Sequence, residues 1–150
     1  LRTSWIYSPF GQNFLKTMLR LGETRDAINV VANQCGCPTA AADIAGAIVA
    51  IASMLRAKPD DARLRGTFHL AGSGEATWAE FAQTIFGETA RHGRKRVNVV
   101  SITAAEYPTA AARPNNSRLN CDKLAETYGL RLPDWQSSAR ACVAQLMGGA

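Results

Sequence analysis

Segments with the composition of β-strands alternate along the chain with segments of helical periodicity, and few architectures are compatible with that order. Strand-like runs occupy residues 1–7, 28–31, 66–72 and 97–102. Helical segments separate these runs and follow the last one. When strands and helices alternate, each helix buries its apolar stripe against a sheet, and the result is a layered α/β structure. The sequence therefore predicts an α/β fold, without an internal repeat or a low-complexity linker that would divide it.

The helices are indicated by apolar side chains at three- and four-residue spacing and by capping residues. A Thr-x-x-Glu capping box, in which both side chains satisfy backbone N–H groups at a helix start, occurs at 77–80. The same pattern recurs at 103–106, but Pro108 limits any helix there to a turn. Residues 34–39 contain Gly and Pro and are expected to form a rigid loop. Helices are expected at residues 12–21, 44–55, 121–128 and 133–147, and from Thr77 onward.

The composition is that of an ordinary globular protein. Hydrophobic residues make up 47% of the sequence, which excludes disorder as its main state. No apolar run approaches the roughly 20 residues of a membrane-spanning helix, so no membrane partner is expected. The four cysteines (Cys35, Cys37, Cys121 and Cys142) are too scattered for a disulfide scaffold, and Cys-x-Cys is not the usual zinc spacing. We expect reduced thiols in a cytoplasmic protein.

The formal net charge of +5 permits an acidic partner. Much of the positive excess lies in residues 91–96. A nucleic-acid-binding segment usually adds a recognition motif or stacking aromatic side chains, and this stretch has neither. We therefore expect a solvated loop and no nucleic-acid partner. A non-catalytic basic binding module is kept as the alternative from a different functional class.

The sequence contains no motif of a complete active site. The nearest approach to a glycine-rich phosphate loop is Gly72-Ser73-Gly74, which is interpreted as a turn. No Tyr-x-x-x-Lys pair occurs, and neither His69 nor His92 has a partner that suggests a catalytic triad. We predict no catalytic residue and no metal ligand in this segment. Because the first seven residues already have the composition of a buried strand, we expect the chain to be a piece of a larger α/β enzyme.

Seven groups of residues follow one another in a set order from one end of the chain to the other. They are LRTSWIYS (1–8), NF (13–14) with MLR (18–20), QCGCPT (34–39) with DIA (43–45), HLAGSGE (69–75), AEYPT (105–109), RPNNSRL (113–119) and LPDW (132–135). Together they resemble the dTDP-4-dehydrorhamnose reductase family. The resemblance runs nearly end to end in this chain and covers only the C-terminal half of that family.

The resemblance implies part of an extended short-chain dehydrogenase/reductase with an NAD(P)-binding, Rossmann-like fold. Such enzymes use NADPH, or NADH, to reduce dTDP-4-dehydro-L-rhamnose to dTDP-L-rhamnose for cell-surface polysaccharides such as lipopolysaccharide. Their N-terminal half carries the glycine-rich cofactor loop and the Tyr-x-x-x-Lys pair, so the cofactor is expected to bind mainly there. Since this chain has neither motif, we expect it to be inactive alone. A homodimer of the complete enzyme and a bound Mg²⁺ are both compatible with the resemblance.

The same resemblance implies a division of labour within the complete enzyme. Residues 1–150 are expected to form the substrate-binding C-terminal region. Strands near 1–7 and 66–72 are expected to complete the sheet of the N-terminal half. Another nucleotide-sugar epimerase or reductase of the same superfamily is the nearest alternative.

Four residues are expected to contact the sugar and the diphosphate of a dTDP-sugar. Arg113 offers a planar fork of N–H donors matched to phosphate oxygens. Asn116 and Ser117 are short hydrogen-bonding groups that suit sugar or phosphate. The alternative is a surface ion pair for Arg113 and a turn at the Asn-Ser pair. The indole of Trp5 is expected to wall the sugar pocket, with plain core packing as its alternative.

The remaining site residues are implied by the resemblance alone. Gln34 and Thr39 flank the predicted loop that borders the nucleotide site in this family, so they are expected to bind substrate. Arg2, Thr3 and Ser4 are expected to lie on the strand that adjoins the cofactor.

Overall fold

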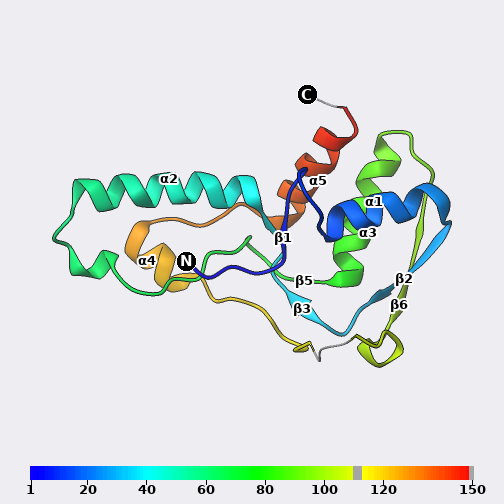
Figure 1. Ribbon diagram of the computed structural model, residues 1–150, viewed down its shortest axis with the longest axis horizontal. Coiled ribbons are helices and arrows are strands. Elements are labelled where there is room, and N and C mark those ends of the chain that lie inside the picture. Colours follow the sequence, from blue (N-terminus) through cyan, green and yellow to red (C-terminus); the bar gives the residue numbers. More distant parts are fainter. Residues whose placement is uncertain (110–112, 149–150) are drawn as a thin grey trace.

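The computed structural model describes residues 1–109 and 113–148, and it confirms the predicted α/β fold (Figure 1). The described chain contains five α-helices. They are α1 (Phe14–Thr24), α2 (Ala41–Ala57), α3 (Trp78–Arg91), α4 (Asp122–Tyr128) and α5 (Trp135–Leu146). The strands are β1 (Ile6–Tyr7), β2 (Ala27–Val31), β3 (Cys35–Gly36), β4 (Thr39–Ala40), β5 (Ala76–Thr77) and β6 (Asn98–Ile102). Two 3₁₀ turns are η1 (Ala62–Leu64) and η2 (Ala104–Glu106).

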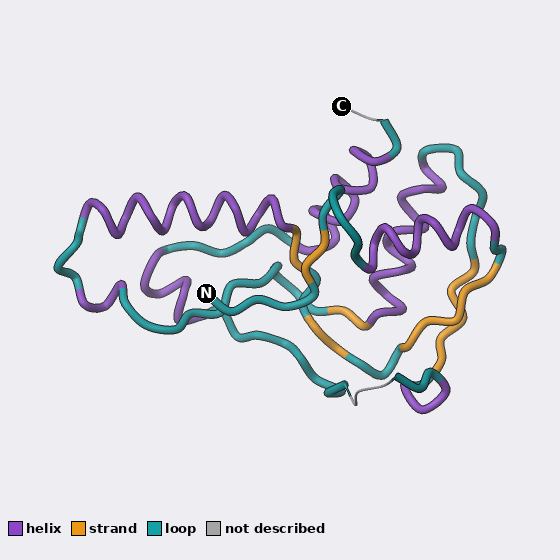
Figure 2. The backbone as a smooth tube through the Cα atoms, in the orientation of Figure 1, coloured by secondary structure: helices purple, strands orange, loops and turns teal. Residues whose placement is uncertain are grey.

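Within the described residues the strands form three two-stranded sheets. The longest is the parallel pair of β2 and β6, in register from Ala27 opposite Asn98 to Val31 opposite Ile102. β1 pairs with β4 in parallel, and β3 pairs with β5 in antiparallel orientation. Figure 2 shows β2 and β6 side by side at one end of the molecule, away from the shorter strands near the centre. Long-range pairing therefore joins segments that α2 and α3 separate in the sequence.

The elements divide into two lobes, each with its own apolar cluster. The large lobe contains α1, α3, α5, β2 and β6, and the small lobe contains α2, η1 and α4 (Figure 1). In the large lobe the cluster is centred on α3, where Phe81, Ala82 and Ile85 are fully buried. In the small lobe α2 packs its Ala47 and Ile51 over a second, smaller cluster.

Local side-chain hydrogen bonds account for most of the helix starts. The Thr77 hydroxyl accepts from the Glu80 N–H at 3.1 Å, while the Glu80 carboxylate accepts from the Thr77 N–H at 2.7 Å. This is the predicted capping box, and the one predicted at 103–106 is also present. As expected, that second box opens only a single turn, η2. Asn13 caps α1 by accepting from the Lys16 N–H at 3.1 Å.

Three predicted segments differ from the structure. Of residues 1–7 only Ile6–Tyr7 is a strand, and 66–72 is not a strand, although Arg2 forms one parallel bridge with His69. The pairing stops there because the backbone turns at Trp5, whose φ of 48° directs the chain toward β4 instead. Residues 34–39, predicted as a loop, contain β3 and the first residue of β4, because distant segments pair with them.

Candidate functional site

A cavity of about 1020 Å³ opens in the large lobe between α1, β2 and residues 102–109. The N-terminal end of α3 and the residue at position 113 complete its lining. Residues from widely separated parts of the sequence therefore meet around one space. The lining side chains that matter most below are Phe14, Arg25, Gln34, Trp78, Tyr107 and Arg113.

One wall of this cavity is aromatic. The rings of Phe14 and Trp78 lie 4.6 Å apart between centroids and are inclined at 46°. Trp78 is also stacked on Trp5, with the ring centroids 3.5 Å apart and the planes only 7° from parallel. Phe14 and Trp78 line the cavity, whereas Trp5 lies behind Trp78 and is not part of the lining. The cavity lining therefore includes two aromatic side chains, which can pack against an apolar or planar group.

The charged side chains of the lining favour an anion. Neither the Arg25 nor the Arg113 guanidinium has an ion-pair or hydrogen-bond partner among residues 1–109 and 113–148. Glu106 is the acidic residue of the lining, and its carboxylate is occupied by the N–H and hydroxyl of Thr103. These bonds hold the pKa of Glu106 below its ordinary value. The lining thus contains two cationic side chains and one carboxylate, which is already bonded to protein donors.

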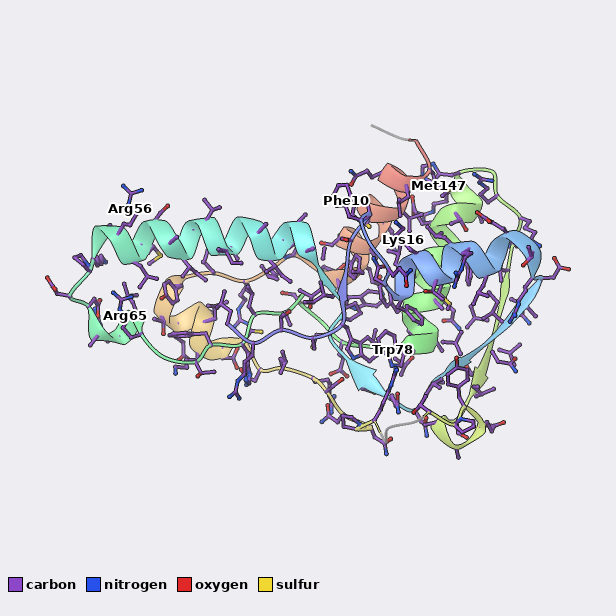
Figure 3. All side chains as sticks on the ribbon, in the orientation of Figure 1. Phe10, Lys16, Arg56, Arg65, Trp78 and Met147 are labelled. Carbon is purple, nitrogen blue, oxygen red and sulfur yellow. The ribbon has the colours of Figure 1, made fainter. Side chains whose placement is uncertain are left out.

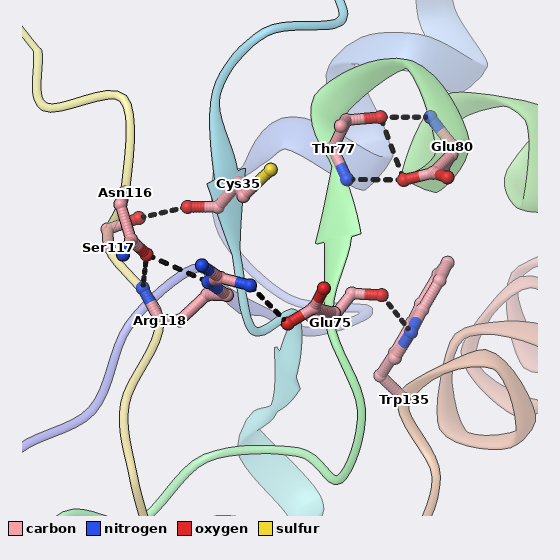
Figure 4. A network of polar contacts seen from close by, with 8 residues as sticks. All are labelled: Cys35, Glu75, Thr77, Glu80, Asn116, Ser117, Arg118 and Trp135. Carbon is pink, nitrogen blue, oxygen red and sulfur yellow. Dashed lines mark hydrogen bonds and ion pairs between the residues drawn. The ribbon is translucent and has the colours of Figure 1, made fainter.

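Next to the cavity, Trp5 is connected to the segment that follows Arg113. Its indole Nε1 donates to the Ser117 hydroxyl at 3.0 Å. The Ser117 hydroxyl and the Ser117 backbone N–H both donate to the Cys35 carbonyl, at 3.1 and 2.8 Å. The Cys35 N–H in turn donates to the Asn115 carbonyl at 2.8 Å. Residues 115–117 are therefore attached to β3, as Figure 4 shows for Ser117 and Cys35.

A second set of polar contacts continues from Asn116 toward α5. The Asn116 side-chain carbonyl accepts from the Arg118 backbone N–H and from its Nε, at 3.1 and 3.0 Å. Arg118 forms an ion pair with Glu75 at 2.7 Å, and the Glu75 carbonyl accepts from the Trp135 indole at 3.1 Å (Figure 4). The carbonyl oxygen of Asn116 is thus engaged within the protein.

The predicted substrate residues fall into two groups. Gln34 and Arg113 line the cavity, so the structure brings together two residues that are far apart in the sequence. Thr39 lies in the interior with no exposed surface. Its hydroxyl donates to the Cys37 carbonyl at 2.9 Å and accepts from the Gly72 N–H at 3.1 Å. The Thr39 side chain therefore braces two loops and does not face the cavity.

The predicted cofactor residues lie outside the cavity lining. The Arg2 backbone donates to Phe68 and accepts from Leu70, with both bonds at 2.8 Å. The Thr3 hydroxyl oxygen is enclosed and has no hydrogen-bond partner in the described part of the chain. The Ser4 hydroxyl lies 3.5 Å from the Cys37 carbonyl. An enclosed hydroxyl without a partner is costly, and it leaves one polar contact available to a bound group.

Several cavity residues were not predicted from the sequence. Trp78 was assigned only to the third helix, and Phe14 to the first helix and to the second matched group, without a role at the site. Nothing in the local pattern around Trp78 indicates that Trp5 stacks on its other face. Tyr107 belongs to one of the seven matched groups, and that position could have identified it. Arg25 follows directly after α1 and gives no local signal of its role.

Other predicted features can be placed as well. All four cysteines are free, as expected. In the basic stretch Arg91 forms an ion pair with Glu88 at 3.3 Å and Lys95 with Asp26 at 3.0 Å, so part of its charge is neutralised locally. Among the described residues, no cluster of three His, Cys, Asp or Glu side chains could hold a metal ion. No described helix has both the length and the apolar character needed to cross a membrane.

Comparison with known proteins gives one consistent family. The sequence model of the RmlD substrate binding domain matches residues 1–147. A dTDP-4-dehydrorhamnose reductase of Sinorhizobium fredii is 54% identical over 147 residues, which are 98% of this chain and 49% of that protein.

Solved structures agree with that relationship. A dTDP-4-dehydrorhamnose reductase from Bacillus anthracis, in complex with NADP, superposes with a TM-score of 0.82 at 35% identity, over 96% of this chain and 47% of that one. The Clostridium acetobutylicum protein of the same name gives a TM-score of 0.84 at 34% identity, over 97% and 47%. The chain spans about half the length of these relatives. It belongs to the RmlD substrate binding domain family.

Proposed function

We propose that this chain is the substrate-binding part of an NADPH-dependent dTDP-4-dehydrorhamnose reductase. The reaction is the reduction of dTDP-4-dehydro-L-rhamnose to dTDP-L-rhamnose, which supplies cell-surface polysaccharides such as lipopolysaccharide. The observation that carries the proposal is the cavity, which combines an aromatic wall with the guanidinium of Arg113, for which residues 1–109 and 113–148 provide no ion-pair partner. A thymidine diphosphate has a planar base and two adjacent anionic groups, and the cavity offers a complement to each.

Within this cavity each group has a distinct task. Arg113 holds the diphosphate through paired N–H donors, as guanidinium groups commonly do. The wall of Phe14 and Trp78 packs against the flat part of the nucleotide. Gln34 supplies an amide from the cavity lining. Outside the cavity lining, we assign the ring edge of Trp5 and the amide nitrogen of Asn116 to the sugar.

We assign only a few contacts with the cofactor to this chain. The enclosed, unpartnered hydroxyl of Thr3 fits one polar contact to a bound dinucleotide, and Arg2 and Ser4 flank it on the same segment. When bound, NADPH supplies the hydride for the C4 carbonyl. We assign most of its binding, and the proton donor, to the half of the relatives that this chain does not match. The residues described above bind the sugar nucleotide and orient it toward that half.

Location and assembly complete the proposal. Four free thiols suit the reducing conditions of the cytoplasm, where nucleotide sugars are made. The complete enzyme is proposed to be a homodimer, and any Mg²⁺ would have to find ligands other than a preformed cluster of the described residues.

Calorimetric titration of dTDP into this chain tests the proposal, because the residues assigned to the diphosphate and the base belong to it. Replacing Arg113 by Ala should weaken binding by about 10- to 100-fold, since charge-assisted hydrogen bonds contribute roughly 1.5–3 kcal/mol. Arg65→Ala is the matched control, because Figure 3 shows Arg65 on the small lobe, far from Trp78. Equal affinity of the Arg113→Ala and unsubstituted chains would refute the diphosphate role.

A second experiment addresses the reaction. The chain should be joined to the N-terminal half of the Sinorhizobium fredii relative and assayed with NADPH on dTDP-, UDP- and GDP-linked 4-keto sugars. Turnover of the dTDP sugar, with little turnover of the others, is the expected result. Preference for a UDP or GDP sugar would favour the alternative, a different nucleotide-sugar enzyme of the same superfamily.

A further inference from the structure

Trp5 occupies a backbone conformation that tryptophan rarely adopts. Its φ of 48° lies in the left-handed region, and it is the one described residue other than glycine found there. Such a conformation persists only where surrounding contacts hold it. The contacts are visible on both faces of the indole, because one face is stacked on Trp78 and the other lies against Gly36.

Gly36 is necessary for this arrangement because it has no side chain. A Cβ atom at position 36 would lie 2.3 Å from Cε2 and 2.5 Å from Nε1 of the Trp5 ring, far inside contact distance. The indole thus fits between a backbone surface and a second indole. Because both faces are occupied, the ring is held in one orientation. In that orientation the Nε1–H donates to the Ser117 hydroxyl.

The Ser117 hydroxyl uses its hydrogen-bonding capacity within the protein. The Ser117 hydroxyl donates its single proton to the Cys35 carbonyl and accepts from Trp5, so it has no donor left for a ligand. This residue was predicted to bind substrate directly. We propose instead that Ser117 is a positioning residue. Through Trp5, which Trp78 and Gly36 clamp, it holds residues 113–117 against β3 and so fixes Arg113 at the cavity.

This inference rests on the proposed function for its consequence, but its structural part can be tested separately. The chain has three tryptophans, and each indole N–H gives its own NMR signal, assignable from Trp→Phe variants. Exchange of the Trp5 indole N–H with solvent reports on the bond to Ser117. The Trp135 indole, which donates to the Glu75 carbonyl at 3.1 Å, serves as an internal reference.

Two substitutions should release the clamped ring. Ser117→Ala removes the acceptor, and Trp78→Leu removes the stacking face. Each should accelerate Trp5 N–H exchange by about 10-fold or more, because the bond would open locally without global unfolding. The Trp135 signal should be unaffected, and the backbone amides of Cys35 and Ser117 should also exchange faster. Trp78→Phe keeps an aromatic face and should have the smaller effect. Unchanged Trp5 exchange in both Ser117→Ala and Trp78→Leu would overturn the inference.

The consequence for binding is tested with dTDP and a double-mutant cycle. Ser117→Ala and Trp5→Phe should each weaken dTDP binding by about 5-fold, and the double variant should be no weaker than either one, because both break the same bond. Ser117→Thr, which keeps the hydroxyl, should restore affinity. Losses that add together would show that Ser117 contacts the ligand itself and would overturn the positioning role. If the unsubstituted chain does not bind dTDP, the proposed function fails, while the exchange experiment still decides the role of the clamp.

Discussion

The two lobes bury their apolar side chains in different ways. In the large lobe, α3 lies between α1, α5 and the β2–β6 pair, and Phe81 contacts the rings of Tyr7, Phe14 and Trp135. In the small lobe, α2 covers its cluster with one face only. On its other face Ile48 is 48% exposed and Val49 is 66% exposed. The large lobe thus buries α3 on several sides, whereas the small lobe leaves one apolar face of α2 uncovered.

This difference follows the division of labour in the proposed enzyme. The cavity lies against α1, β2 and the start of α3 in the large lobe, and a ligand site needs rigid surroundings. Helices that are apolar on all sides are normally packed on all sides. We therefore expect the open face of α2 to be covered in the complete enzyme by the half that this chain does not match. The lobes should respond differently to substitution.

The largest effect is expected for Phe81→Ala. The Phe81 side chain is fully buried at the centre of the large lobe, and truncation of such a ring costs about 3–5 kcal/mol. Chemical denaturation followed by circular dichroism measures the loss, and dTDP affinity should fall with it. Phe10→Ala is the control, because Phe10 is 75% exposed. A loss below about 1 kcal/mol would show that the large lobe does not hold the stability assigned to it.

Leu124→Ala should have a smaller effect, confined to the small lobe. Leu124 is buried beneath α2 beside Tyr128, and a Leu→Ala change in a core costs roughly 2–5 kcal/mol. We expect the lower part of this range because the cluster is small and partly open. Hydrogen exchange should accelerate in α2 and α4, while dTDP affinity stays unchanged. A parallel fall in affinity would show that the lobes are coupled.

Thr77→Ala should cost about 1 kcal/mol, since it removes the capping hydroxyl of α3. Thr77→Ser retains the hydroxyl and is the control. Because Trp78 is the first residue of α3, fraying here should also loosen the Trp5 stack. Faster exchange of the Trp5 indole N–H would record that loosening. Stability equal to that of Thr77→Ser would mean that the capping box adds nothing to this helix.

The smallest effect is expected for Val49→Ser on the open face of α2. Exposed substitutions usually change stability by no more than about 0.5 kcal/mol. Ile51→Ser, two positions away and buried, should be strongly destabilising. The difference in stability loss between these two variants should narrow in the fused enzyme described above, because Val49→Ser is expected to become costly there. An equally small effect in the fused protein would show that this face remains open.

Local signals in the sequence predicted the helices well. The capping boxes at 77–80 and 103–106 each depend on residues three positions apart, so the pattern contains all the partners. Two-residue strands such as β3 and β4 depend on partners far along the chain, and their composition alone suggested a loop. Residues 66–72 have the composition of a strand but make a single bridge, because the partner segment turns away at Trp5.

The candidate site also depends on contacts between distant segments, which the local sequence does not indicate. Gln34 and Arg113 were selected through the resemblance, and the structure places both at the cavity. The hydroxyl of Ser117 looked suitable for a ligand until its partners, Trp5 and Cys35, were known. Trp78 and Arg25 have no local pattern that distinguishes them from ordinary helix and turn residues. Which side chains share a cavity is decided by tertiary packing that short sequence motifs do not record.

The pairing of β2 with β6 also affects how the protein is made. Ala27 lies opposite Asn98, so α2 and α3 must be synthesised before the two strands can meet. A nascent chain that has not yet emerged from the ribosome past residue 102 lacks one side of the cavity, and Arg113 follows later still. Closing so long a loop delays the last step of folding. A ligand of this cavity can therefore stabilise the chain only after residue 113 has been made.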